Sequence, residues 1–63
     1  MSRALVRGEQ AQELRSLYDQ LETATGVAAE MLRTYGVDSE EFSVADNQVA
    51  GIWRQIRELL SVN

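Results

Sequence analysis

Residues 33–42 read Arg-Thr-Tyr-Gly-Val-Asp-Ser-Glu-Glu-Phe, and this stretch contains the signals that end one helix and begin another. Gly36 suits the left-handed C′ position that commonly follows the last turn of a helix. Val37 would then be the C″ residue and would contact Leu32 in a Schellman motif. The stretch therefore predicts two helices joined by a tight corner at residues 36–38.

The second half of the same stretch carries the signals of a helix start. Asp38 has a side chain typical of an N-cap, and Glu41, three residues later, completes a capping box. Val37 and Phe42 then have the spacing of a hydrophobic staple. A helix start at Ser43 is the alternative interpretation, but it would leave Phe42 in a loop.

Apolar and small residues follow a heptad pattern on both sides of the corner. Their spacing alternates between three and four residues over about residues 9–35 and again over about residues 39–61. In an antiparallel hairpin, residues that face each other have numbers with a constant sum, and here six pairs sum to 73. The pairs are Leu14 with Leu59, Leu17 with Ile56, Leu21 with Ile52, Ala24 with Val49, Ala28 with Ala45, and Met31 with Phe42. This common register predicts an all-α fold, an antiparallel two-helix hairpin.

The chain has 63 residues and contains no cysteine, histidine or proline. A domain of this size buries only about 60% of its unfolded surface, so it usually needs disulfides, a metal ion or oligomerisation. Disulfides need cysteine, and the common zinc and iron sites need cysteine or histidine. We therefore expect no metal site and no cofactor, and oligomerisation is the remaining source of added stability.

An apolar column lies beside the heptad core in both predicted helices, at the heptad position called e. Its large members are Tyr18, Leu32, Trp53 and Leu60. A single hairpin is one thin layer and leaves this column uncovered, whereas domains pack at least two layers. We expect the four residues to form an interface, with a second copy in a homodimeric four-helix bundle or with an obligate helical partner protein.

The composition also narrows the function. The absence of histidine and cysteine excludes Ser-His-Asp and Cys-His catalysis. The adjacent carboxylates Glu40 and Glu41 have no nucleophile and no apolar surroundings, so we expect no enzyme. No apolar run is long enough to span a membrane, and residues 1–7 lack the apolar segment of a signal peptide, so a cytoplasmic location is expected. The function favoured is a small non-catalytic protein–protein interaction module, such as an adaptor, an assembly factor or a regulatory subunit.

Charge is unevenly distributed along a chain whose net charge is −4. Acidic residues lie around the corner, at Asp38, Glu40, Glu41 and Asp46, and most arginines lie towards the open end of the hairpin. Antiparallel docking of two copies would bring these opposite charges together.

The alternative function is a small nucleic-acid-associated regulator that binds through the arginine-bearing open end, at Arg3, Arg7, Arg54 and Arg57. The negative net charge argues against a nucleic-acid partner. Residues 1–8 are expected to form an N-terminal arm.

Overall fold

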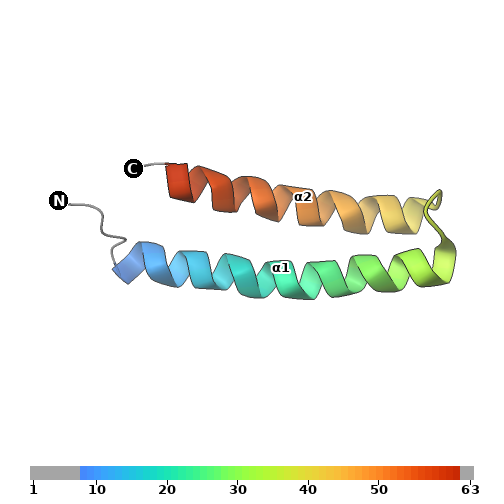
Figure 1. The fold of residues 1–63 in the computed structure, drawn as a ribbon, viewed down its shortest axis with the longest axis horizontal. Coiled ribbons are helices and arrows are strands. Elements are labelled where there is room, and N and C mark those ends of the chain that lie inside the picture. Colours follow the sequence, from blue (N-terminus) through green and yellow to red (C-terminus); the bar gives the residue numbers. More distant parts are fainter. Residues whose placement is uncertain (1–7, 62–63) are drawn as a thin grey trace.

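The computed structural model describes residues 8–61, which form two helices (Figure 1). Helix α1 comprises Gly8–Tyr35 and helix α2 comprises Glu40–Ser61. The two helices run side by side in opposite directions, with the corner at one end of the molecule (Figure 1). The predicted all-α helical hairpin is confirmed. Residues 1–7, which make up nearly all of the predicted N-terminal arm, lie outside the described residues, and Gly8 is already the first residue of α1.

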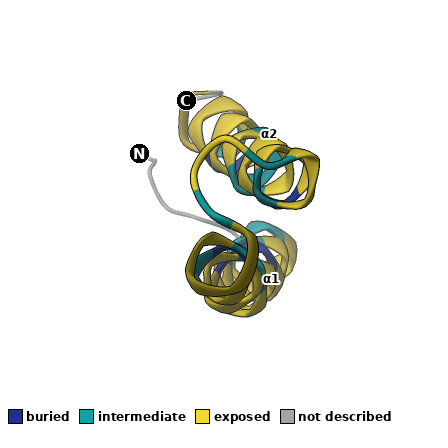
Figure 2. Ribbon diagram, turned by 90° about the vertical axis from the view of Figure 1, so that its right-hand side faces the viewer, coloured by how far each residue is buried: buried dark blue, intermediate teal, exposed yellow. Residues whose placement is uncertain are grey.

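The core lies along the seam between the helices. Leu17, Leu21 and Ile56 form its centre, and Ile56 is only 1% exposed. Four partly buried residues pack against this cluster: Leu14, Val49, Ile52 and Leu59. All twelve members of the six predicted pairs are buried or half-buried. In Figure 2 the buried and half-buried stretches lie on the sides of the two helices that face each other, while the outer surfaces of both helices are exposed.

Helix α1 ends at a glycine, as predicted. Gly36 has a φ of 95°, which is the left-handed conformation that glycine adopts without strain. Its backbone N–H donates to the carbonyl oxygen of Leu32 at 3.0 Å. A bond from the C′ N–H to the C3 carbonyl oxygen defines the simple αL motif, so the predicted Schellman motif is wrong. Val37 is accordingly 66% exposed.

Helix α2 is capped by Ser39 and not by Asp38. The Phe42 backbone N–H donates to Ser39 Oγ at 3.1 Å, which makes Phe42 the N3 residue. The Ser39 hydroxyl also donates to the carbonyl oxygen of Gly36 at 2.8 Å. A hydroxyl can accept and donate at the same time, whereas an ionised carboxylate can only accept. Ser39 therefore links the end of α1 to the start of α2. The predicted N-cap is wrong by one residue, and the predicted capping box is wrong because Phe42, and not Glu41, is the N3 residue.

The hairpin is a single layer one helix thick. Its Cα atoms extend over 48 × 16 × 10 Å, so it has two broad faces. In an antiparallel pair of helices, the e positions of both helices lie on one broad face and the g positions lie on the other. These two faces differ in chemistry.

Candidate interaction surface

The four predicted interface residues are large, apolar and exposed. The exposed fractions are 43% for Tyr18, 42% for Leu32, 39% for Trp53 and 47% for Leu60. These four residues are called the aromatic face below. The heptad core beside them is buried, so their exposure results from the thinness of the hairpin and not from loose packing.

Tyr18 and Trp53 join the two helices on the aromatic face. Their ring centroids are 6.3 Å apart and their planes meet at 86°, an edge-to-face arrangement. This contact places the e positions of α1 and α2 on the same side of the molecule. Leu32 lies in the last turn of α1 beside the corner, and Leu60 lies in the last turn of α2 at the open end. The aromatic face therefore extends along the whole hairpin.

Small residues alternate with these large ones. Ala11 and Thr25 share the e column of α1 with Tyr18 and Leu32. On α2, the neighbouring b column contains Ser43, Ala50 and Arg57, and the e column also contains Asp46. All six of these additional residues are exposed. Large and small side chains thus alternate along the face, which also carries a few charges.

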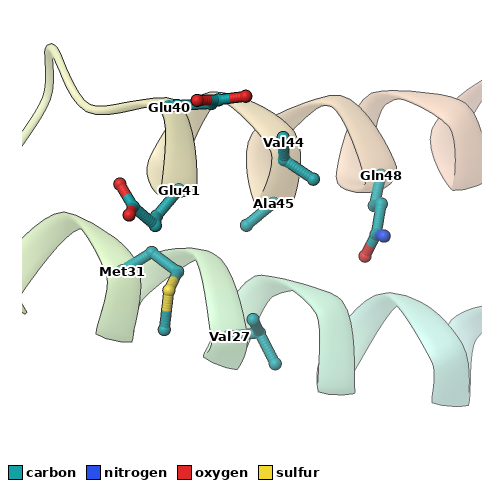
Figure 3. Close-up of a pocket in the computed structure, with 7 residues that line it drawn as sticks. All are labelled: Val27, Met31, Glu40, Glu41, Val44, Ala45 and Gln48. Carbon is teal, nitrogen blue, oxygen red and sulfur yellow. The ribbon is translucent and has the colours of Figure 1, made fainter. Parts of the chain in front are cut away.

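The opposite face is mostly polar. Its g positions are Glu13, Gln20, Val27, Thr34, Glu41, Gln48 and Gln55. An apolar groove of about 400 Å³ lies on this face near the corner and is drawn in Figure 3. Val27 and Val44 line this groove and are 44% and 52% exposed, and Glu40 and Glu41 contribute acidic side chains to it. Sequence analysis missed the groove, although valines at g and c positions depart from the heptad pattern and could have indicated it.

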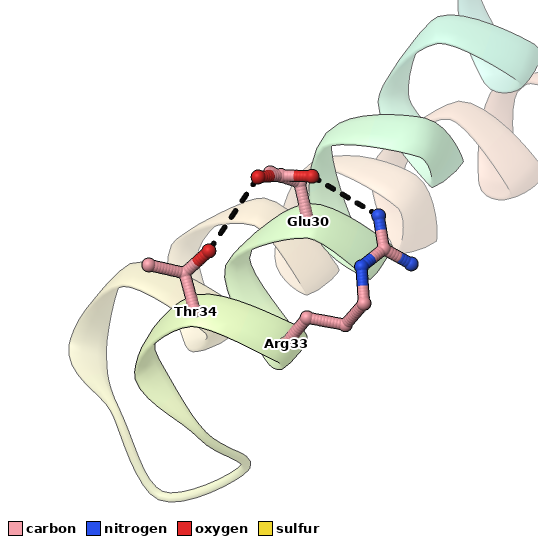
Figure 4. Close-up of polar contacts among 3 residues, drawn as sticks. All are labelled: Glu30, Arg33 and Thr34. Atoms are coloured by element: carbon pink, nitrogen blue, oxygen red, sulfur yellow. Dashed lines mark hydrogen bonds and ion pairs between the residues drawn. The ribbon is translucent and has the colours of Figure 1, made fainter.

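The charged groups make few contacts within the hairpin. Arg33 pairs with Glu30 at 3.0 Å, and the Thr34 hydroxyl donates to the same carboxylate at 3.5 Å (Figure 4). Both charged side chains are more than half exposed, so the pair contributes at most about 1 kcal/mol. Among residues 8–61, Arg15, Arg54 and Arg57 form no ion pair. These three arginines are available to an external partner.

Two of the arginines proposed as nucleic-acid contacts lie close together on α2. Arg54 and Arg57 line one shallow hollow with Glu58, Leu60 and Ser61. Glu58 places a negative charge in this hollow, so it is not a uniformly basic surface. Arg3 and Arg7 lie outside the described residues.

Residues 8–61 contain neither a metal-binding cluster nor a helix that could span a membrane. No group of three or more acidic, histidine or cysteine side chains there could hold a metal ion. Neither α1 nor α2 is long and apolar enough to cross a membrane. No polar or charged side chain within the same range is buried.

No protein-family model, no curated protein and no solved structure matches this chain. The function of the protein is therefore inferred from the surfaces of the hairpin.

Proposed function

We propose that this chain is a small non-catalytic protein–protein interaction module that acts as a helical dimer, and that the aromatic face is its binding surface. An adaptor, an assembly factor or a regulatory subunit would each use such a module. The supporting observation is that four large apolar side chains, between 39% and 47% exposed, lie on one face. Exposed apolar surface gathered on one face of a protein marks an interaction site.

The thinness of the hairpin supports the same proposal. Its Cα atoms extend only 10 Å in the shortest direction, and Ile56 is the one large side chain of residues 8–61 that is less than 2% exposed. Packing a second helical layer on the aromatic face would bury Tyr18 and Trp53 and produce the two-layer arrangement that stable domains have.

The oligomeric state tests this proposal. We expect sedimentation velocity at micromolar concentration to give about twice the chain mass of 7.1 kDa. Trp53 is the only tryptophan, so its fluorescence reports on the aromatic face alone. Dilution should shift its emission to the red as the face becomes exposed to water. A chain that sediments as a monomer at all of these concentrations would contradict the proposal.

Matched variants distinguish the aromatic face from the rest of the surface. Leu32→Gln and Trp53→Gln each replace an exposed apolar side chain on this face, and we expect both variants to be helical monomers. Val44→Gln is the control, because Val44 is 52% exposed on the opposite face. It should remain dimeric. Loss of the dimer in Val44→Gln, with retention in Trp53→Gln, would assign the interface to the opposite face.

A nucleic-acid-associated regulator is the second candidate. Arg54 and Arg57, which form no ion pair among residues 8–61, favour it because they line one hollow. The test is fluorescence anisotropy with mixed-sequence DNA and RNA across a salt series. Binding through phosphates would weaken steeply as salt increases. Absence of binding at low salt would eliminate this candidate.

A further inference from the structure

We infer that the occupant of the aromatic face is a second copy of this chain, docked antiparallel so that each helix lies along its own copy. The inference rests on the proposed function, because it names the partner and the orientation at that same surface. It is supported by the order of large, small and charged residues on the face.

Large and small residues on α1 lie at complementary distances from the middle of the helix. The middle of Gly8–Tyr35 lies between Leu21 and Glu22, so residues facing each other across an antiparallel copy have numbers that sum to 43. Leu32 then faces Ala11 of the second copy, and Tyr18 faces Thr25 of the second copy. In both contacts a large exposed side chain fills the space above a small one.

The same axis determines the contacts of α2. Because facing residues within the hairpin sum to 73, an axis at the middle of α1 makes facing residues of α2 and its copy sum to 103. Trp53 then faces Ala50 of the second copy, and Leu60 faces Ser43 of the second copy. Each large side chain of the aromatic face thus faces a small residue of the second copy. The register set by the middle of α1 gives these contacts on α2 without any further shift.

Charge complementarity follows from this register as well. Asp46 faces Arg57 of the second copy, and symmetry produces this contact twice. Both side chains are exposed, and neither forms an ion pair among residues 8–61. The like-charge contact in this arrangement is Glu22, which lies beside its own copy at the axis. This one like-charge contact is outnumbered by the two Asp46–Arg57 contacts.

The parallel arrangement, with both corners at the same end, has poorer contacts. There α1 lies along α2 of the second copy at the register of the hairpin itself. Arg15 comes within one residue of Arg57, again twice, so like charges meet. Tyr18 comes within two residues of Trp53, so a large side chain faces another large one.

The size of the face is sufficient for a stable pair. A broad face of 48 × 16 Å has an outline of about 770 Å². Specific interfaces bury about 800 Å² on each partner. A pair of this size therefore needs the two faces to overlap over their full length, which the central position of the axis provides.

Distance measurement between spin labels tests the orientation directly. The chain has no cysteine, so Asp38→Cys places one label at the corner of each copy. Antiparallel docking separates the two corners by about 40 Å, because the 28 residues of α1 make 27 steps of about 1.5 Å each. Parallel docking would bring them within about 20 Å, because packed helices are about 10 Å apart. Glu22→Cys is the control, because its labels lie close together at the axis of the antiparallel dimer.

A charge reversal provides an independent test. In the antiparallel dimer Arg57→Asp faces Asp46, so we expect the dimer Kd to rise about tenfold. Adding Asp46→Arg in the same chain should restore the original Kd. In the parallel dimer Arg57→Asp would instead meet Arg15 and lower the Kd.

The outcomes separate the two proposals. A long corner distance together with a weakened Arg57→Asp dimer supports antiparallel docking. A dimer with a short corner distance, or one tightened by Arg57→Asp, overturns this orientation and leaves the proposed interaction module in place. A chain that shows no dimer by sedimentation and no dipolar coupling between Glu22→Cys labels overturns both.

Discussion

Substitution of Gly36 tests the account of the corner. This glycine has a φ of 95°, and a Cβ placed on it would have no heavy atom within 4 Å. The penalty for a larger residue therefore comes from the backbone conformation and not from a steric clash with the rest of the protein. A left-handed backbone conformation costs an L-residue about 1–2 kcal/mol, so Gly36→Ala should lower the free energy of unfolding by about that amount. Gly36→Val should lose more, because β-branched residues tolerate positive φ least.

The assay is urea unfolding followed by far-UV circular dichroism, at one fixed protein concentration. The concentration has to be fixed because self-association raises the apparent free energy of unfolding. Gly26→Ala is the matched control. A Cβ at Gly26 also meets nothing within 4 Å, but this residue lies inside α1 with ordinary helical backbone. The free energy of unfolding of Gly26→Ala should be higher by about 0.5–1 kcal/mol, because alanine has a higher helix propensity than glycine.

A third variant gives the result that would refute the reasoning. A chain of 63 residues is accessible to chemical synthesis, so D-alanine can be placed at Gly36. D-residues favour positive φ, and the space around Gly36 is open. We expect this variant to be more stable than the natural chain by about 0.4–1 kcal/mol, because its unfolded state has less conformational freedom. If D-alanine destabilised as much as L-alanine, or if Gly36→Val unfolded at the natural midpoint, the explanation from φ would be wrong.

Three further predictions concern the core, the cap and the surface. Ile56→Ala should lose about 2–5 kcal/mol in urea unfolding, because Ile56 is only 1% exposed; a loss under 1 kcal/mol would mean that the seam is not the core. Ser39→Ala removes the hydrogen bond from the Phe42 N–H and should lower the free energy of unfolding by about 1 kcal/mol, whereas Asp38→Ala should lower it by less than about 0.5 kcal/mol. The reverse order would restore Asp38 as the N-cap. Glu30→Ala removes an exposed ion pair and should change the melting temperature very little, in low or high salt; a shift that vanished in salt would contradict this.

The sequence analysis identified the helices, the buried positions along their seam and the exposed column correctly because each depends on periodicity. A helix has 3.6 residues in each turn, so apolar residues recur at regular intervals on the buried face. Many positions therefore indicate the same face, and one residue that departs from the pattern does not change the prediction. The placement of Tyr18 and Trp53 on one exposed face was predicted from the same periodicity. Once the heptad core was assigned, their e positions placed them on one side of a single layer, and both are exposed there.

Other features depended on atoms that periodicity does not describe. Asp38 and Ser39 are both good N-caps by residue type, and the sequence alone favoured Asp38. The three-dimensional corner decided for Ser39, because only its hydroxyl reaches Gly36 and Phe42 together.

By itself, then, the sequence determined that this protein is an antiparallel hairpin with one apolar face left uncovered. Only the tertiary structure decided how the corner is closed and that Val27 and Val44 line a groove on the opposite face. The physical reason is one of scale. Burial in a helical pair repeats over many residues, so it can be predicted from the order of apolar and polar residues. A cap or a groove depends instead on the positions of a few atoms from segments that the fold brings together.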